Sequence, residues 1–258
     1  MFKFDFTGKV ALVTGGAEGL GKEFVQTLAE QGADVAFCDV QDEKGKATEK
    51  ELAGKTGKKI KYWHCDVTDE EQVAQMVSEI VAEFGKIDKL VNNAGRLTYG
   101  PIESYSKEQW MQVIDTDLTG PWLVSKEVVK QSMMKNGGGR IVNISSVAGM
   151  FGTDAGCPSY HAAKGGVLGL IKGQAVEYAK YGVLVNGVGP GTFLNGGMTS
   201  RSKVASNPDT HKKGRCPLKR AGDFGELSGA VIYFLSDENT FTTGQNIMVD
   251  GGLTSALN

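Results

Sequence analysis

The 258-residue sequence lacks the features that mark several protein classes. No apolar run approaches the roughly 20 residues that cross a bilayer, so we expect no membrane partner. The first residues, MFKFDFTGKV, lack the charged-then-apolar order of a signal peptide. Only six prolines occur and there is no low-complexity run, which argues against a disordered or collagen-like chain. These absences predict a globular protein.

Cysteine is scarce, and an excess of charge of one sign is missing. None of the four cysteines forms a CxxC pair, so we interpret them as reduced, mostly buried thiols of a cytoplasmic protein with no metal site. They are Cys38, Cys65, Cys157 and Cys216. Lys and Arg number 28 and Asp and Glu 30, for a net charge of −2. This balance argues against nucleic acid as the main partner.

Glycine, by contrast, is abundant, with 36 residues or about twice the usual share. Short apolar segments alternate with longer helical patterns, which is typical of a parallel sheet covered by helices on both faces. Strands are predicted at 10–14, 34–38, 59–64, 89–92, 140–145, 183–188 and 246–249. Helices are predicted at 19–31, 42–55, 69–84, 106–134, 158–181 and 224–236. The fold class is therefore α/β, a single-domain, doubly wound Rossmann-type sheet of seven strands.

A glycine-rich turn, TGGAEGLG at residues 14–21, ends the first predicted strand and opens the first helix. Gly15 permits a sharp turn, Gly19 lets a pyrophosphate approach the backbone, and Gly21 lets helix and strand pack closely. The helix N-terminus, which includes Leu20, attracts phosphate through its free N–H groups and its partial positive charge. We therefore predict a dinucleotide site; the alternative is a plain glycine-rich turn.

The second predicted strand leads to Asp39, twenty residues beyond Gly19. A carboxylate there can accept hydrogen bonds from the adenosine ribose hydroxyls, and it repels a 2′-phosphate. Glu18 adds a second negative charge, and no Arg or Lys lies within the turn or the strand. These residues favour NAD over NADP; the alternative is that Asp39 is an ordinary residue of a strand-end turn.

Together with four further motifs, these residues resemble the classical short-chain dehydrogenase/reductase family over essentially the whole chain. Asn-Asn-Ala-Gly stands at 92–95, and Ser146 precedes Tyr-His-Ala-Ala-Lys at 160–164. Pro-Gly follows at 190–191 and Val-Asp-Gly-Gly at 249–252. The resemblance implies an NAD-dependent oxidoreductase that is a homotetramer or a homodimer.

The resemblance also implies the residues of the site. The catalytic residues would be Ser146, Tyr160, Lys164 and Asp117. Asp66 and Val67 would lie near the adenine, and Asn93 to Gly95 beside the cofactor ribose. The full implied cofactor set is Gly15, Glu18, Gly19, Leu20, Gly21, Asp39, Asp66, Val67, Asn93, Ala94, Gly95, Tyr160, Lys164, Pro190, Gly191, Thr192 and Phe193.

Tyr160 and Lys164 stand four residues apart on a predicted helix, so they share one face. A phenol with a pKa near 10 is a poor base at neutral pH, and a nearby ammonium lowers that pKa. The family then assigns proton transfer to Tyr160, the nicotinamide ribose to Lys164 and the substrate oxygen to Ser146. Ser145 is an alternative to Ser146. The family serine stands about thirteen residues before the tyrosine, whereas Ser146 stands fourteen and Ser145 fifteen residues before Tyr160. We choose Ser146 by its pattern.

Three residues depart from the family. Asp117 occupies the usual Asn position of a proton-relay helix, and we expect it either to keep the relay or to act only as a cap or kink. Asn195 stands where a Thr often holds the carboxamide, so Thr192 and Asn195 are both candidates. Arg96 follows Asn-Asn-Ala-Gly, where apolar residues are common, and binds an anionic substrate unless it is only a solvated surface residue.

We expect residues 1–136 to bind mainly the cofactor and 137–258 to carry the catalytic and substrate groups. A polar, basic lid is predicted at about 191–222. The first candidate function is oxidation of a sugar, sugar acid or other polar polyol as the small-molecule substrate. A 3-oxoacyl thioester reductase or a hydroxysteroid dehydrogenase is the alternative within the family. An NAD-binding sensor is the alternative outside enzymes.

Overall fold

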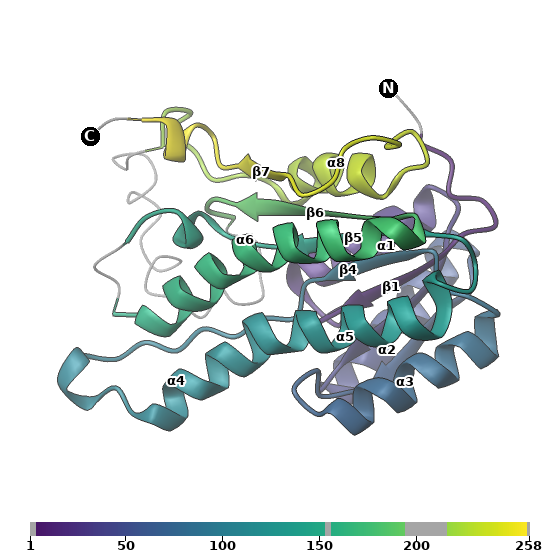
Figure 1. Ribbon diagram of the computed structural model, residues 1–258, viewed down its shortest axis with the longest axis horizontal. Coiled ribbons are helices and arrows are strands. Elements are labelled where there is room, and N and C mark those ends of the chain that lie inside the picture. Colours follow the sequence, from purple (N-terminus) through teal and green to yellow (C-terminus); the bar gives the residue numbers. More distant parts are fainter. Residues whose placement is uncertain (1–3, 153–155, 194–215, 257–258) are drawn as a thin grey trace.

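A parallel sheet forms the centre of the protein (Figure 1). The structure is a computed structural model that describes residues 4–152, 156–193 and 216–256. Within these residues seven strands pair in the order β3-β2-β1-β4-β5-β6-β7. They are β1 (Val10–Thr14), β2 (Asp34–Asp39), β3 (Ile60–His64), β4 (Lys89–Asn92), β5 (Gly139–Ile144), β6 (Val183–Pro190) and β7 (Asn246–Val249). The predicted fold class is confirmed, with strand ends within two residues of those expected.

Helices cover both faces of the sheet, because the central strands β1, β2 and β4 are buried on both sides and have no polar face to leave in water. One apolar core lies under α1 (Gly19–Glu30), α2 (Asp42–Thr56) and α8 (Phe224–Leu235). The opposite core lies under α3 (Glu70–Phe84), α5 (Gly120–Val128) and α6 (Pro158–Tyr178), which stand in front of the sheet in Figure 1. Three of the four cysteines are buried, as predicted.

The predicted helix 106–134 is present but not regular. It consists of α4 (Lys107–Ile114), a π-helical turn η2 (Asp115–Thr119), α5, and a second π-helical turn η3 (Val129–Met133). A π turn inserts an extra residue per turn and re-aims the side chains that follow. Here η2 turns Asp117 fully inward, where none of its surface is exposed. Short 3-10 turns complete the description: η1 (Ile102–Ser104), η4 (Val147–Gly149), η5 (Ala179–Tyr181) and η7 (Leu253–Ser255).

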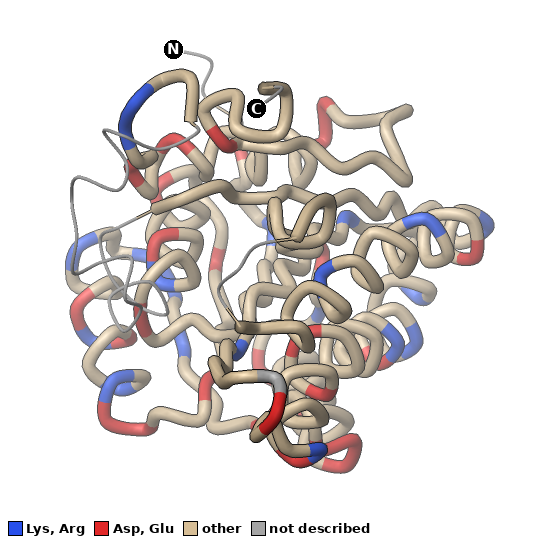
Figure 2. Tube along the Cα trace, turned by 90° about the vertical axis from the view of Figure 1, so that its left-hand side faces the viewer, with Lys and Arg blue, Asp and Glu red and all other residues tan. Residues whose placement is uncertain are grey.

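The strand order reverses between β1 and β4, which are neighbours in the sheet although β2 and β3 separate them in sequence. Doubly wound sheets bind ligands at the carboxyl ends of the strands beside such a switch point. The glycine turn after β1 and the segments that follow β4, β5 and β6 all emerge at that edge. Among the described helices, none combines the length and the apolarity that crossing a membrane requires. Figure 2 shows acidic and basic residues interspersed along the described chain.

Candidate active site

In the turn between β1 and α1, neighbouring backbone atoms lie so close that only glycine fits at two positions. A Cβ on Gly21 would lie 1.9 Å from the carbonyl oxygen of Gly15. Gly15 has a φ of +66°, and its Cβ would lie 2.8 Å from Cα of Ala94. The start of α1 has no side-chain cap, and its first turn contains no acidic residue. Its N–H groups therefore remain able to bind a phosphate.

The segment after β4 fastens this turn. Asn93 Nδ2 donates to the carbonyl oxygens of Thr14 (3.0 Å) and Gly15 (3.1 Å). The Thr14 hydroxyl accepts the N–H groups of Asn93 and Ala94, both at 3.0 Å. The Asn93 side chain thus positions the turn from within the protein. Sequence reasoning did not find Thr14, although its place in the TGxxxGxG pattern was a signal.

A cluster of polar residues surrounds the end of β2. Asp39 is 9% exposed, and its Oδ2 accepts the N–H of Ala17 at 3.2 Å while Oδ1 accepts that of Gln41 at 3.1 Å. Glu18 is paired with Lys44 of α2, whose Nζ lies 2.6 Å from Glu18 Oε2. Lys44 lies outside the turn and the strand in the sequence, and α2 brings it to Glu18, so its charge offsets that of Glu18.

The segment after β3 forms the next wall of this edge. The carboxylate of Asp66 accepts the backbone N–H and the hydroxyl of Thr68 at 2.9 and 2.8 Å. Val67 is buried, and a Cβ on Gly120 would meet its side chain at 2.9 Å. These contacts hold the two residues that were predicted near an adenine.

The two serines after β5 face different neighbours. The Ser145 hydroxyl donates to Asn246 Oδ1 of β7 at 2.7 Å. The Ser146 Oγ accepts the N–H of Ala148 at 3.1 Å, and hydrogen bonding from Ser146 lowers the pKa of Tyr160. Of the two serines, Ser146 is the one that affects the pKa of Tyr160, and its choice as the catalytic serine stays a prediction.

Lys164 is buried below Tyr160 and holds three parts of the site together. Its Nζ lies 5.6 Å from the centre of the Tyr160 ring and donates to the carbonyl oxygen of Ile144 at 3.0 Å. It also lies 3.2 Å from Oδ2 of Asp117. Close packing of α6 on η2 makes this approach possible, since a Cβ on Gly166 would lie 2.7 Å from the Leu118 side chain. Asp117 therefore faces the lysine directly.

The charges of this group oppose one another. Desolvation raises the pKa of Tyr160, and the ammonium of Lys164 lowers it by less, so the net direction is upward. Lys164 thus acts on the pKa of Tyr160 in the expected, downward direction, and burial outweighs it. Burial would lower the pKa of Lys164, but the Asp117 and Tyr160 charges raise it and prevail. Burial raises the pKa of the Asp117 carboxyl against the attraction of Lys164.

Arg96 joins the site through its backbone. Its N–H donates to Asp117 Oδ1 at 2.6 Å, so one carboxylate holds both Lys164 and the loop after β4. Arg96 is exposed, and within the described residues its guanidinium makes no hydrogen bond or ion pair. The exposed side chain therefore has no partner within the described residues, while its backbone contacts the site.

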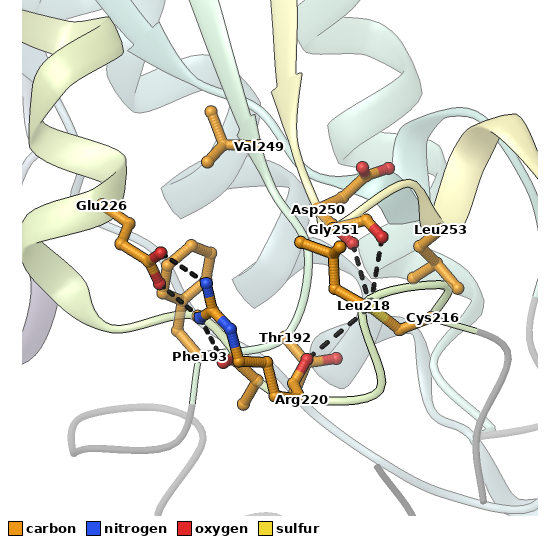
Figure 3. Close-up of a pocket in the computed structure, with 12 residues that line it drawn as sticks. Thr192, Phe193, Cys216, Leu218, Arg220, Glu226, Val249, Asp250, Gly251 and Leu253 are labelled. Carbon is orange, nitrogen blue, oxygen red and sulfur yellow. Dashed lines mark hydrogen bonds and ion pairs between the residues drawn. The ribbon is translucent and has the colours of Figure 1, made fainter. Parts of the chain in front are cut away.

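A cavity of about 130 Å³ lies where β6, β7 and the segment before α8 meet (Figure 3). Thr192 and Phe193 follow the predicted Pro190-Gly191 motif and line it, with Phe193 4% exposed. The N–H of Gly222 donates to the Thr192 carbonyl at 2.9 Å, which joins the two ends of the predicted lid. Asn195 and residues 194–215 of the lid lie outside the described residues.

Comparison with known proteins identifies the family. A family model described as enoyl-(acyl carrier protein) reductase matches residues 15–254. The 3-alpha-(or 20-beta)-hydroxysteroid dehydrogenase of Mycobacterium bovis is 40% identical over 97% of this chain and 91% of its own. This chain belongs to the classical short-chain dehydrogenase/reductase family. As a short-chain dehydrogenase/reductase, it is an oxidoreductase acting on alcohols and ketones.

Two further members of the family carry acid groups in their names or ligands. The trans-4-hydroxycyclohexanecarboxylate dehydrogenase of Sinomonas cyclohexanicum is 38% identical over 97% of this chain and 94% of its own. A gluconate 5-dehydrogenase from Burkholderia cenocepacia J2315, solved with NADP and tartrate, has a TM-score of 0.91 at 34% identity. The match covers 99% of this short-chain dehydrogenase/reductase and 98% of that one.

The family uses a nicotinamide cofactor, and the residues of this short-chain dehydrogenase/reductase fit one. The uncapped start of α1 can bind a pyrophosphate, and the positions of Gly15 and Gly21 leave no room for a side chain. A carboxylate at the end of β2 stands where an adenosine ribose is bound in this fold.

Proposed function

We propose that this protein is an NAD-dependent dehydrogenase that interconverts a secondary alcohol and a ketone on a substrate bearing a carboxylate. The observation that carries the proposal is the grouping of Ser146, Tyr160 and Lys164 at the switch-point edge, where the backbone of the exposed Arg96 contacts Asp117. A sugar acid or another polyol acid is the substrate class that this arrangement suits best.

The cofactor would lie along the strand ends. Gly15, Gly19, Leu20 and Gly21 would hold the pyrophosphate, and Asp39 the adenosine ribose. Asp66, Val67 and the residues 93–95 would line its adenine and ribose. Lys164 and Tyr160 would hold the second ribose, and Pro190, Gly191, Thr192 and the backbone of Phe193 the carboxamide end. When bound, the nicotinamide exchanges a hydride with the carbinol carbon.

The chain's own residues then supply orientation and a proton acceptor. Ser146 donates a hydrogen bond to the substrate oxygen and holds it beside Tyr160. Tyr160 takes the hydroxyl proton during oxidation and returns it during reduction. The ammonium of Lys164 stabilises the phenolate, and Asp117 holds that ammonium in place.

Arg96 supports the choice of an acid. A guanidinium matches the two oxygens of a carboxylate, and this one has no ion-pair partner among the described residues. The relatives named for hydroxycyclohexanecarboxylate and gluconate support the same class. The relative named for hydroxysteroids supports an apolar alcohol as the second candidate.

Asp39 supports NAD as the cofactor, since its carboxylate lies at the end of β2 and contacts the glycine turn. The gluconate dehydrogenase relative was solved with NADP, so the two cofactors need direct comparison. We also place the protein in the cytoplasm as a homodimer or homotetramer. Apolar side chains exposed on α5, α6 and the loop before β7 support self-association, namely Trp122 (44%), Val176 (82%) and Phe241 (99%).

The test is reduction of NAD⁺ and NADP⁺ with sugar acids, hydroxycyclohexanecarboxylates, neutral sugars, 3-hydroxyacyl thioesters and hydroxysteroids. We expect NAD⁺-linked turnover of the carboxylates and none by Tyr160→Phe. Arg96→Met should lower kcat/KM on acids by about 100-fold, or about 2.7 kcal/mol, and change it little on a neutral alcohol. Turnover of hydroxysteroids alone would favour the second candidate. Activity that survives Tyr160→Phe would refute the mechanism.

A further inference from the structure

Two carboxylates and one ammonium meet at the rim of the adenosine site. Lys44 Nζ lies 2.6 Å from Glu18 Oε2. Gln41 Nε2 donates to Glu18 Oε1 at 3.2 Å and to Asp39 Oδ1 at 3.3 Å, so it bridges the two acids. The charge of Glu18 is therefore cancelled by Lys44, and the net charge of the cluster is that of Asp39.

The backbone that carries Lys44 is fastened to the glycine turn. The hydroxyl of Thr48, one helical turn further along α2, donates to the Ala17 carbonyl oxygen at 2.9 Å. Gly45 lies so close to Tyr62 that a Cβ would meet the ring at 2.4 Å. The position of α2 is thus fixed by packing, whereas the Lys44 side chain is 47% exposed and, among the described residues, is held only by its pair with Glu18.

Lys44 can leave Glu18 for another anion at a small cost in free energy. The side chains are 30% and 47% exposed, and ion pairs of that exposure contribute about 0–1 kcal/mol. A phosphate with up to two negative charges competes well with one carboxylate for an ammonium. In this fold the ribose 2′-position lies beside the carboxylate at the end of β2, and a nearby cation there accommodates a 2′-phosphate.

We propose that Lys44 is a latent 2′-phosphate ligand of the cofactor site: the Asp39 carboxylate supplies the charge that excludes NADP, and Lys44 is the cation that binds the 2′-phosphate once that charge is removed. The inference rests on the proposed function, in which this edge binds a nicotinamide dinucleotide. With Asp39 in place, Lys44 stays with Glu18 and the 2′-hydroxyl of NAD is accepted by Asp39. Without it, Lys44 leaves Glu18 for the phosphate.

The experiment measures binding rather than turnover, by fluorescence titration with NADH and NADPH. Asp39→Ser should bind NADPH more tightly than the wild type does. Adding Lys44→Met should weaken that NADPH affinity by at least about tenfold and leave NADH affinity nearly unchanged. The matched control is Asp39→Ser with Lys50→Met, which removes the same charge from an exposed position further along α2. It should retain most of the NADPH affinity of Asp39→Ser.

The outcomes separate this inference from the proposed function. If the wild type binds neither dinucleotide, the proposed function itself is refuted. If NADH binds and both double variants bind NADPH equally, only the role of Lys44 is refuted. Failure of Asp39→Ser to gain NADPH affinity, with NADH still bound and circular dichroism unchanged, would also overturn it.

Discussion

Asp117 Oδ2 and Lys164 Nζ lie 3.2 Å apart in the interior, where the two side chains are 0% and 5% exposed. The Asp117 charge raises the pKa of Tyr160 and that of Lys164. Replacing Asp117 with Asn removes this charge, so the pKa of Tyr160 should fall. Because oxidation needs the phenolate, the acidic limb of the kcat/KM profile should move to lower pH. The measurement is alcohol oxidation followed from about pH 5 to 10.

A role limited to capping or kinking the helix would affect stability and leave the profile in place. Asp115→Asn is the matched control, since Asp115 begins the same π turn and has no ion pair in the described part of the chain. It should leave the profile unmoved. An Asp117→Asn enzyme with the wild-type profile would exclude the proposed electrostatic role.

Alanine substitution should lower catalysis at Ser146 and stability at Ser145. Ser146→Ala removes the hydrogen bond to Tyr160 and to the substrate oxygen, and we expect kcat to fall about 10²–10³-fold. Ser145→Ala removes only the bond to Asn246, so kcat should stay near the wild-type value while unfolding becomes about 1 kcal/mol easier. Steady-state kinetics and urea unfolding on both variants test this. The reverse pattern would reassign the serine.

The alternation of apolar strands and helical patterns predicted the sheet well, because its buried central strands leave strong local signals. Features that depend on tertiary packing leave weaker signals in the sequence. The π turn that buries Asp117 reads as ordinary helix in the sequence, since its inward turn depends on packing against α6. Lys44 lies outside the glycine and strand motifs, and only the fold of α2 brings it to Glu18. Local motifs therefore identified the candidate residues, whereas their charges depended on tertiary contacts.

Alanine substitutions at Gly21 and at Gly54 should change the stability of the fold in opposite directions. At Gly21 the added methyl would lie 1.9 Å from a backbone oxygen, so the glycine turn must shift. We expect loss of stability and at least about a tenfold loss of NADH affinity. At Gly54, exposed inside α2, a Cβ meets nothing within 4 Å and alanine should stabilise the protein by about 0.5–1 kcal/mol. Urea unfolding and NADH titration test both. Normal NADH affinity in Gly21→Ala would contradict the packing argument.

The ion pair between Asp237 and the buried Lys89 should make the stability of the fold depend on pH. Lys89 begins β4, at the opposite end of the strands from the glycine turn. Lys89 of β4 is buried, and its Nζ lies 2.7 Å from Asp237 Oδ1 while Lys9 lies 2.8 Å from Oδ2. Burial alone would raise the pKa of Asp237, but these two ammonium groups prevail and lower it to about 2. Asp237→Asn should destabilise the fold by about 1–2 kcal/mol at neutral pH, below the usual value for a broken buried pair because the carboxylate is half exposed.

The sign of the pH dependence follows from the lowered pKa. The carboxylate stabilises the folded chain fully above its unfolded pKa of about 3.9, and that contribution is lost as pH falls towards 2. The gap in unfolding free energy between wild type and Asp237→Asn should therefore narrow between pH 5 and pH 3 in urea titrations. Glu238→Gln, an exposed neighbour, should show no such gap at either pH. A gap for Asp237→Asn that is equally wide at pH 5 and pH 3 would mean that packing, not the ion pairs with Lys89 and Lys9, holds Asp237 in place.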